Sequence, residues 1–390
     1  MNNDPIVITS MARTPMGAFQ GVLKNLSGTD LGTAAIRAAI ERSSLGSGDV
    51  CEVMMGNVLP AGLGQAPARQ AALGAGLDPS TPCTTISKVC GSGMKATMLA
   101  HDLIAVGSAD IIVAGGMESM TNAPYLVPKM RSGARLGHAR MLDHMFFDGL
   151  EDAYDKGRLM GTFAESCADH YQFTREQQDD YALASLDRAL KAIESGHFRK
   201  EIVAIDNAGN VVETDEQPGK ARPEKIPTLK PAFRKDGTVT AANASSISDG
   251  GAALVLMRQS EAKKRGLKPL AAIRGHSSHA RAPEWFTTAP VGAIQQLMEK
   301  TGWSVSDVDL FEINEAFAVV PLAAMKELDI PHDKVNVHGG ACALGHPLGT
   351  SGARIIVTLL GALETYGLKR GVASLCIGGG EATAIAVERL

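Results

Sequence analysis

The sequence is short of the features that mark several classes of protein. Aromatic residues make up only 4% of it, and the net charge at pH 7 is -4. The chain therefore has no excess of positive charge to hold nucleic acid or an anionic membrane without specificity. Every apolar stretch is interrupted by Gly, Ser, Asp or Lys before it reaches the roughly 20 residues that a membrane helix needs. We expect no membrane span and no nucleic-acid partner.

Metal-binding and secretory patterns are also missing. The six cysteines are scattered over the chain with no CxxC pair, and neither an HExxH motif nor a clustered acidic loop occurs. We therefore predict reduced thiols and no catalytic metal. The first residues, Met1–Pro5, lead into a strand-like apolar run without the basic head and cleavage site of a secretory signal. A cytoplasmic location is expected.

What the chain does contain is an internal duplication. With 45% apolar residues and 42 glycines, the composition fits two or three globular units. A shift of 258 positions aligns Glu41–Ser43 with Glu299–Thr301, and the same shift later aligns Gly91 with Gly349. Two different glycine-rich turns therefore occupy equivalent positions in the two copies.

Each of these turns leads into a helical apolar pattern and then a short apolar strand. The strands are Ile111–Ala114 in the first copy and Val372–Cys376 in the second, and glycines follow both. The alternation indicates two α/β halves with helix-covered, largely parallel sheets. If the halves pack against each other, their equivalent turns meet at a shared crevice.

Residues 118–240 fit neither copy and are rich in charge and proline. We interpret them as an inserted loop domain between an N-terminal half (1–117 and 241–269) and a C-terminal half (270–390). Acidic residues near its start and Gly196 after its end predict a helix over Arg175–Glu194. The apolar run Ala252–Leu256 predicts a strand that returns to the first half.

Cys90 lies in the first glycine-rich turn, Ser87–Lys95, just before a predicted helix. Glycines there let a substrate approach the backbone. The free N–H groups and dipole of the helix favour a thiolate, so we expect a lowered pKa and a nucleophile at neutral pH. A buried structural cysteine is the alternative, and this feature alone does not decide between them.

His346 lies in the second turn, Asn336–Gly349, before a proline that fixes the local backbone. A lone histidine is more often structural than catalytic. The duplication, however, aligns His346 with Lys88, two residues before Cys90. An imidazole at that position can take the Cys90 proton and later bind an acyl oxygen.

Two further strand ends carry candidate groups. Cys376 precedes Ile377 and three glycines, which suggests a thiol beside open backbone, although a buried strand cysteine is the alternative. The segment Asn314–Ala318 follows the predicted strand Leu310–Ile313. An amide there can hold a water or an oxyanion, or Asn314 and its neighbouring glutamate can cap the next helix.

Together these segments resemble the thiolase family. The motifs are Cys-Gly-Ser-Gly at Cys90, Asn-Glu-Ala-Phe at Asn314, Gly-His-Pro at His346 and Cys-Ile-Gly-Gly-Gly at Cys376. Their order and spacing cover nearly the whole chain, and three further segments add to the resemblance: Ala12–Pro15, Gly115–Met120 and Gly237–Ser245. The resemblance implies duplicated α/β halves with helix-covered mixed sheets, and an inserted loop domain that binds coenzyme A and makes oligomer contacts.

The resemblance also implies an acetyl-CoA acyltransferase, which condenses acetyl-CoA with acyl-CoA and reversibly cleaves 3-ketoacyl-CoA. Cys90 would carry the acyl group after His346 activates its sulfur, and Cys376 would move the proton at the methyl carbon of acetyl-CoA. The backbone N–H groups of Cys90 and Gly378 would form one oxyanion site. His346 and a water held by Asn314 would form the other.

Contacts with coenzyme A follow from the same resemblance. Ser245 and the loop domain would hold the pantetheine and nucleotide between apolar walls formed by Met160, Ala316 and Phe317. Lys220 or Arg222 would supply the charge of an arginine that the family carries where this chain has Gly219. Acetyl-CoA, acyl-CoA and free coenzyme A are then substrates and products, and no cofactor is expected. A homotetramer, built as a dimer of dimers, is also expected.

One departure from the family concerns substrate length. Leu159 stands where the short-chain biosynthetic pattern has histidine, and Phe286 stands in place of a methionine. Because an isobutyl group offers an apolar surface, we hypothesise that 3-ketoacyl-CoA substrates longer than acetoacetyl-CoA are accepted. Phe286 or a neighbouring loop would oppose this by closing the same space.

Two other functions fit part of this pattern. A ketoacyl-carrier-protein synthase also pairs a cysteine with histidine, but it uses a second catalytic histidine where this chain has Asn314 or Cys376. A non-catalytic coenzyme A or lipid carrier predicts the loss of a catalytic group, whereas all four candidates are present. Both comparisons favour a thiolase.

Overall fold

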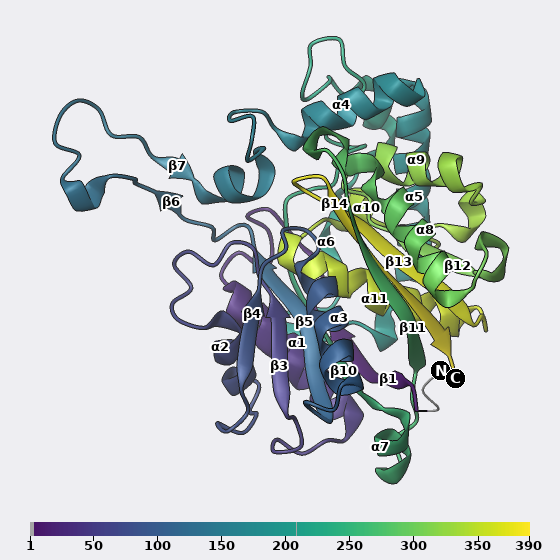
Figure 1. Cartoon of the computed structure of the whole chain (residues 1–390). Helices are drawn as coiled ribbons and strands as arrows, with labels where there is room; N and C mark the ends of the chain where they lie inside the picture. The colour runs from purple at the N-terminus through teal and green to yellow at the C-terminus, as the bar shows by residue number, and fades with distance from the viewer. Residues whose placement is uncertain (1–3, 208) are drawn as a thin grey trace.

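The computed structural model describes residues 4–207 and 209–390, and a ten-stranded mixed sheet runs through it (Figure 1). The strand order is β12-β13-β14-β11-β1-β10-β5-β3-β4, with the short β2 paired to β10. The strands are β1 Ile6–Arg13, β2 Gly17–Ala18, β3 Glu52–Gly56, β4 Cys83–Ile86, β5 Ile111–Ser119, β10 Ser248–Arg258, β11 Ala271–Ala280, β12 Leu310–Ile313, β13 Arg370–Ile377 and β14 Glu381–Arg389.

The directions of the strands correct one expectation. Within the described residues of this sheet, only the pairs β3–β4, β3–β5 and β12–β13 are parallel. The prediction of largely parallel sheets is wrong, because β10 lies antiparallel between β1 and β5, and the glycines after β13 turn the chain straight back into β14. The α/β class and the mixed sheet implied by the family resemblance are confirmed.

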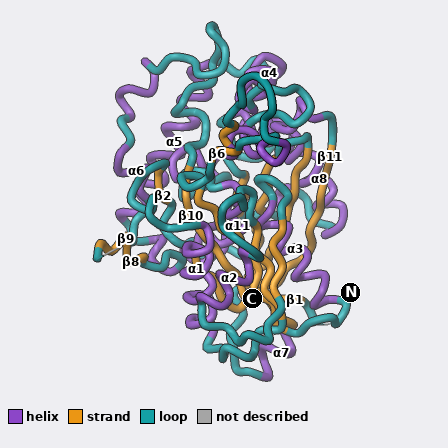
Figure 2. Tube along the Cα trace, turned by 90° about the vertical axis from the view of Figure 1, so that its left-hand side faces the viewer, coloured by secondary structure: helices purple, strands orange, loops and turns teal. Residues whose placement is uncertain are grey.

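Helices form three layers around the strands (Figures 1 and 2). The central helices α3 (Ser92–Ala105) and α11 (Leu348–Thr365) share one apolar core with strands of both halves. The outer face of the first half packs on α1 (Gly28–Ser43) and α2 (Pro67–Gly74). The outer face of the second half packs on α4 (Met160–Tyr171), α8 (Ala289–Thr301) and α9 (Val319–Leu328).

The duplication is visible in the positions of these elements. Helix α1 ends at Ser43 and α8 ends at Thr301, and β3 begins at Glu52 where β12 begins at Leu310. The equivalent helices α3 and α11 cross at their first turns, where a methyl group added to Gly93 would lie 2.9 Å from the carbonyl oxygen of Gly349. Small residues at this crossing let the two glycine-rich turns meet.

The inserted segment contains the helix α5 (Arg175–Glu194), and the prediction of its bounds is confirmed. Thr174 and Gln177 form a capping box at its start, and Gly196 adopts a left-handed conformation beyond its end. The segment is tied to β1 through Arg13, a buried arginine whose guanidinium donates to Glu201 at 2.6 Å and to Asp215 at 2.7 Å.

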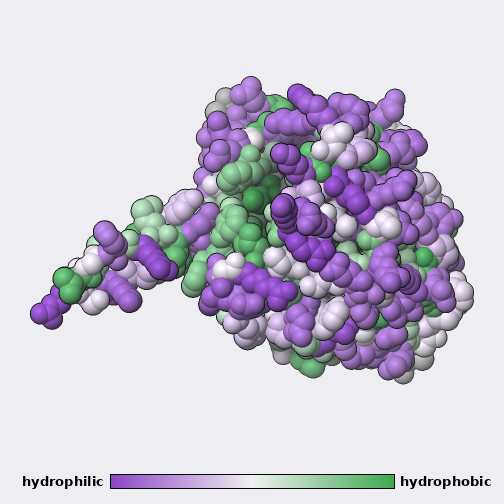
Figure 3. All heavy atoms as spheres, turned by 90° about the horizontal axis from the view of Figure 1, so that it is seen from above, coloured by the Kyte–Doolittle hydropathy of each residue, from purple (hydrophilic) through white to green (hydrophobic). Residues whose placement is uncertain are grey.

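The same segment sends an arm away from the body of the molecule. The arm is built on the strand pair β6 (Tyr125–Leu126) and β7 (Leu142–Asp143), and it projects freely in Figures 1 and 3. The remaining α-helices and strands are α6 Glu216–Lys220, α7 Gln259–Lys264, α10 Ala341–Leu344, β8 Ile205–Asn207 and β9 Asn210–Val212. Nowhere in the described parts of the chain does a helix combine the length and hydropathy needed to cross a bilayer.

Candidate active site

Cys90 sits in a tight turn directly before the N-terminal end of α3. Val89 has a φ of +45°, an uncommon conformation for a β-branched residue. Ser92 holds the turn closed, because its Oγ accepts from the N–H of Lys88 at 2.8 Å and donates to the carbonyl of Val89 at 2.6 Å. The turn directs Cys90 toward the second half, where the side chain of Ile377 approaches Gly91 so closely that no Cβ would fit.

The acidity of Cys90 differs from the expectation. Although part of the residue remains open to solvent, burial raises the pKa of its thiol to about 11, against the opposing effect of N–H groups of Gly378 and of Cys90 itself. The prediction of a lowered pKa is therefore wrong for the resting protein, because desolvation outweighs the helix N-terminus. The two backbone donors nevertheless lie where they favour negative charge at the Cys90 position.

Cys376 lies at the end of β13, facing Cys90 across the junction of the halves. It is fully buried, and burial raises the pKa of its thiol well above the usual range, with the nearby Cys90 adding to that effect. Gly378 follows in the turn, where an added methyl group would lie 3.7 Å from both Val89 and Met160. The structure therefore brings both thiols and the Gly378 backbone to one place.

His346 lies in the turn before α11, and the next residues of that turn, Leu348 and Gly349, pack beside Cys90 and Gly93. Its Nδ1 lies 2.5 Å from the Oγ of Ser351, and the Ser351 hydroxyl donates to the carbonyl of Pro347 at 2.8 Å. Since a serine hydroxyl has one proton, His346 Nδ1 must carry the hydrogen of the first bond. Its Nε2 is then left with a lone pair, which is the form of imidazole that can take a proton from a thiol.

Asn314 lies against this imidazole at the end of β12. Its Nδ2 is 3.5 Å from each ring nitrogen of His346, and its Oδ1 has no hydrogen-bond partner within the described residues. Burial, reinforced by the charge of Arg354, lowers the pKa of His346 to about 3. The ring is therefore neutral at physiological pH, and the Asn314 amide is free to orient a small polar ligand beside it.

Glu315, the next residue, does not cap the following helix, so that alternative is wrong for this residue. Its carboxylate accepts from Tyr181 at 3.0 Å, from Ser185 at 2.7 Å and from the N–H of Cys342 at 2.9 Å. Asn336 donates to it as well, at 2.8 Å. Glu315 thereby holds the turn that carries His346 at its first residue, Asn336, and near its middle, at Cys342. Its place in the Asn-Glu-Ala-Phe motif was the only signal in the sequence.

Glu118 is a second positioning residue that the sequence analysis did not identify. This buried carboxylate at the end of β5 accepts from the side chain of Asn57 at 2.7 Å, from the N–H groups of Val58 and Leu59 at 2.9 and 3.1 Å, and from the N–H of Gly349 at 2.8 Å. It joins the first half to the first turn of α11. Its place in the Gly115–Met120 motif was the available signal.

The residues expected to contact coenzyme A divide into two groups. Lys220 and Arg222 line the rim of a cavity of about 310 Å³ together with Lys225, Ser246 and Cys342. Both side chains are exposed, and Lys220 is ion-paired with Glu216. Both basic groups therefore lie at a cavity beside the turn that bears His346.

The second group lines the apolar side of the site. The N–H of Ser245 donates to the carbonyl of Ala316 at 3.0 Å, so the segment before β10 runs beside the Asn314 motif and brings Phe317 with it. Leu159 precedes α4 and is partly exposed, as is Met160 next to it. Phe286 is buried, and its ring packs edge-on against Phe317 with centroids 6.4 Å apart.

Comparisons of this chain with known proteins all match one family. The model of the thiolase N-terminal domain matches residues 6–260, and that of the thiolase C-terminal domain matches residues 267–389. A probable acetyl-CoA acetyltransferase of Dictyostelium discoideum is 51% identical over 395 residues, covering 100% of this chain and 95% of that protein. Acetyl-CoA acetyltransferase 2 of Arabidopsis thaliana is 52% identical over 398 residues, covering 100% and 98%.

A solved structure is similar over the same length. The Acat5 thiolase from Ascaris suum, crystallised in complex with coenzyme A, has a TM-score of 0.94 and 45% sequence identity to this chain. The similarity covers 99% of this chain and 100% of that one. The fold is therefore shared from end to end.

Proposed function

Since the chain belongs to the thiolase family, we propose that it is an acetyl-CoA acyltransferase that condenses acetyl-CoA with an acyl-CoA and, in reverse, cleaves 3-ketoacyl-CoA with coenzyme A. The observation that carries the proposal is that Cys90 and Cys376 lie close together beside the turn that bears the neutral imidazole of His346. A nucleophile and a separate proton-transfer group are what a two-stage acyl transfer requires.

In the first stage, the Cys90 sulfur attacks the thioester carbon. His346 Nε2 takes the Cys90 proton and returns a proton to the departing sulfur of coenzyme A, so that charge balances over the step. Negative charge on the thioester oxygen is stabilised by the N–H groups of Cys90 and Gly378, the two donors that in the resting protein favour negative charge on the Cys90 sulfur. The product is an acyl group on Cys90.

At the start of the second stage His346 Nε2 takes the proton of the Cys376 thiol, and the Cys376 thiolate then removes a proton from the methyl carbon of acetyl-CoA. The resulting carbanion attacks the acyl carbon on Cys90, and His346 returns its proton to the departing Cys90 sulfur. The thioester oxygen of the carbanion is stabilised by the N–H that His346 Nε2 carries in this stage and by a water bound to the free Oδ1 of Asn314. In the cleavage direction the Cys376 thiol donates the proton instead. Its raised pKa suits this acid role, because the thiol is protonated at neutral pH.

The test follows the acyl group and the carbon–carbon bond separately. After brief exposure to acetyl-CoA, intact-mass measurement is expected to show one added acetyl group, lost in Cys90→Ala. Cys376→Ser is expected to keep the label and lose condensation. Cys51→Ser, which removes an exposed thiol, is the matched control and keeps both. Acetylation mapped to another residue, or turnover by Cys90→Ala, contradicts the proposal.

Binding of coenzyme A completes this proposal. Lys220 and Arg222 at the rim of the 310 Å³ cavity supply positive charge for phosphate groups, while Ser245, Met160, Ala316 and Phe317 line the path of the pantetheine. Coenzyme A thioesters are the substrates, and the reaction uses no metal or organic cofactor, because the thiols and imidazole supply the nucleophile, base and acid. Reduced thiols are required, which suits the cytoplasm, and all six cysteines are free in the structure.

We also propose that the chain forms a homotetramer through the projecting arm. Apolar side chains on the arm are open to solvent, including Met130, Leu136 and Met141 at 55%, 98% and 67% exposure. Such exposure on a monomer favours a protein contact. Light scattering is expected to give four chains per particle in the native protein and fewer in Leu136→Asp. A monomeric native protein contradicts this proposal and leaves the chemistry of Cys90 unaffected.

A further inference from the structure

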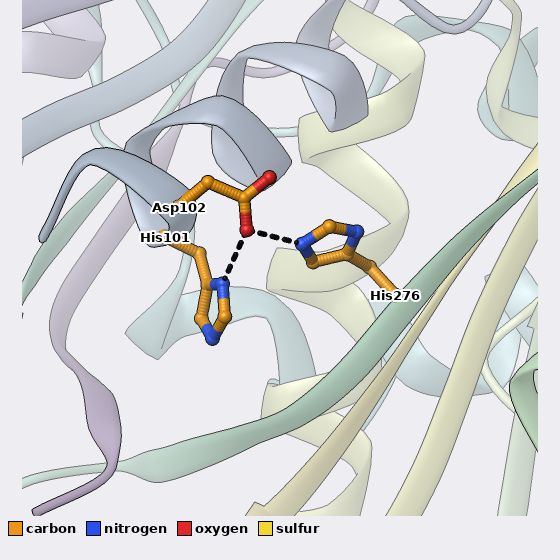
Figure 4. A group of neighbouring side chains, drawn as sticks. All are labelled: His101, Asp102 and His276. Carbon is orange, nitrogen blue, oxygen red and sulfur yellow. Dashed lines mark hydrogen bonds and ion pairs between the residues drawn. The ribbon is translucent and has the colours of Figure 1, made fainter. Parts of the chain in front are cut away.

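A cluster of three metal-ligating side chains lies away from the thiols. His101 and Asp102 come from the last turns of α3, and His276 comes from β11 (Figure 4). One carboxylate oxygen of Asp102 lies 3.0 Å from Nδ1 of His101 and 2.8 Å from Nε2 of His276. All three ligand atoms lie within 4.8 Å of one another. We propose that they form a binding site for one Zn²⁺ ion.

The geometry suits such an ion. Zinc binds imidazole nitrogen at about 2.0–2.1 Å and carboxylate oxygen at about 2.0–2.2 Å, so neighbouring ligand atoms around it stand roughly 3 Å apart. The separations of 3.0 Å and 2.8 Å from the Asp102 oxygen match that spacing. Asp102 is half exposed, so water can reach the remaining coordination position.

A bulge in β11 is what turns His276 toward the helix. The register of β11 against β14 shifts between Ile273 and Gly275. Ile273, before the bulge, packs into the central core with α3, whereas Ser277, after it, donates to the carbonyl of Ala293 on the outer helix α8. Side chains alternate along a strand, so without the extra residue His276 would face α8.

The charged groups beside the cluster leave the imidazole of His276 to the ion. Lys300, a cation near His276, donates to its backbone carbonyl oxygen at 3.0 Å and not to its ring. The carboxylate of Asp102 offsets this charge.

The bound ion would link the two halves, because α3 belongs to the first copy and β11 leads into the second. The zinc site lies away from Cys90. Asp102 follows Cys90 by twelve residues, most of them in α3, which corresponds to about 18 Å along a helix axis. The zinc site therefore does not depend on the proposed function, and either can fail without the other.

The experiment measures Zn²⁺ binding to tag-free protein whose accessible thiols have been alkylated, since thiolates also bind zinc. Native protein is expected to bind one ion per chain, and His276→Asn to weaken binding by at least about tenfold. His101→Gln, at a partly exposed helical position, is expected to do the same. The matched control is His279→Asn, on the same strand with its ring at Gln296, and it leaves binding unchanged.

Anomalous diffraction at the zinc edge locates the ion. A peak about 2.0–2.2 Å from His101 Nδ1, Asp102 and His276 Nε2 supports the site. A peak elsewhere, no binding, or equal binding by native protein and both variants overturns it. Melting temperature without zinc is recorded for every variant, and His101→Gln keeps the proposal testable if His276→Asn fails to fold.

Discussion

Ser351 determines which nitrogen of His346 carries hydrogen. The 2.5 Å contact between Ser351 Oγ and His346 Nδ1 uses the Nδ1 hydrogen, because the serine proton is directed to the carbonyl of Pro347. This leaves Nε2 as the base. The serine lies one helical turn beyond the histidine, on the helix that the turn begins, and thus couples the tautomer to the fold of α11.

Ser351→Ala is therefore expected to lower kcat/KM by about tenfold, the effect of losing one hydrogen bond worth roughly 1 kcal/mol or slightly more at the base. The variant is expected to acylate Cys90 more slowly and to bind coenzyme A as the native protein does. Stopped-flow acylation by acetyl-CoA measures it. Thr358→Ser, two turns along the same helix, is the control for packing and retains the native rate. An unchanged acylation rate in Ser351→Ala contradicts this role.

The two pKa values predict how the thiol responds to pH. With the pKa of Cys90 raised to about 11 and that of His346 lowered to about 3, both groups are neutral between these values. Alkylation of Cys90 by iodoacetamide follows the thiolate fraction and is expected to rise through pH 7, 8 and 9 toward pH 11. Peptide mapping at each pH restricts the measurement to Cys90. A plateau already at pH 7 would show an ion pair between thiolate and imidazolium.

Much of the fold was predictable from local pattern. The helix α5 has a strong cap, an acidic start and a glycine stop, and its bounds agree with the prediction. The strand that precedes Asn314 and the strand that contains Cys376 were predictable, because each is a short apolar run that ends in a polar or glycine-rich segment. Strand direction was not predictable in this way. An apolar run has the same residue pattern whether its neighbouring strand is parallel or antiparallel. The position of β10 depends on its pairing with β1 and β5, which begin before the inserted segment and are far from β10 in the sequence.

For the active site, the sequence indicated which residues to consider, but not how deeply they are buried, how acidic they are or which distant residues they bind. Glycine-rich turns identified Cys90 and His346, but the acidity of Cys90 depends on how deeply it is buried, and that follows from the packing of both halves. The hydrogen bonds of Glu118 likewise join segments far apart in sequence. Burial reversed the expected shift because the cost of a charged thiolate in a dry site exceeds the benefit of two N–H donors.

Glu118 provides a stability test. All four of its bonds are accepted from N–H donors, so Glu118→Gln turns an amide N–H₂ group toward at least one of them. The free energy of unfolding is expected to fall by about 1–3 kcal/mol at neutral pH. Urea denaturation measures it, with Glu364→Gln as the control at a partly exposed carboxylate paired with Lys200.

The pH dependence of the same variant has a definite sign. Burial raises the pKa of Glu118 from 4.5 to about 7, so between these values the folded chain holds a proton that the unfolded chain has released. The contribution of Glu118 to stability therefore decreases as pH rises through this window. Glu118→Gln removes that slope, and denaturation at pH 5, 6 and 7 detects it. An identical slope in native protein and variant would assign the titration to other groups.

The last prediction concerns acyl chain length, for which Leu159 and Phe286 favour opposite outcomes. Phe286 is buried against Phe317 and opens no space. Leu159 is partly exposed and precedes Met160, whose terminal methyl group would lie 3.7 Å from a methyl group added to Gly378. Each buried methylene contributes about 0.8 kcal/mol, or roughly fourfold in kcat/KM, to a substrate that lies along this apolar surface. The native protein is therefore expected to cleave six-carbon 3-ketoacyl-CoA at least as well as acetoacetyl-CoA. Leu159→His is expected to reverse that preference, and Leu159→Met, which keeps an apolar side chain of similar size, to retain it. Steady-state thiolysis of four-, six-, eight- and ten-carbon substrates measures the ratio. A steep fall beyond four carbons in the native protein would restrict it to acetoacetyl-CoA and would assign the limit to the aromatic wall that Phe286 and Phe317 form behind the site.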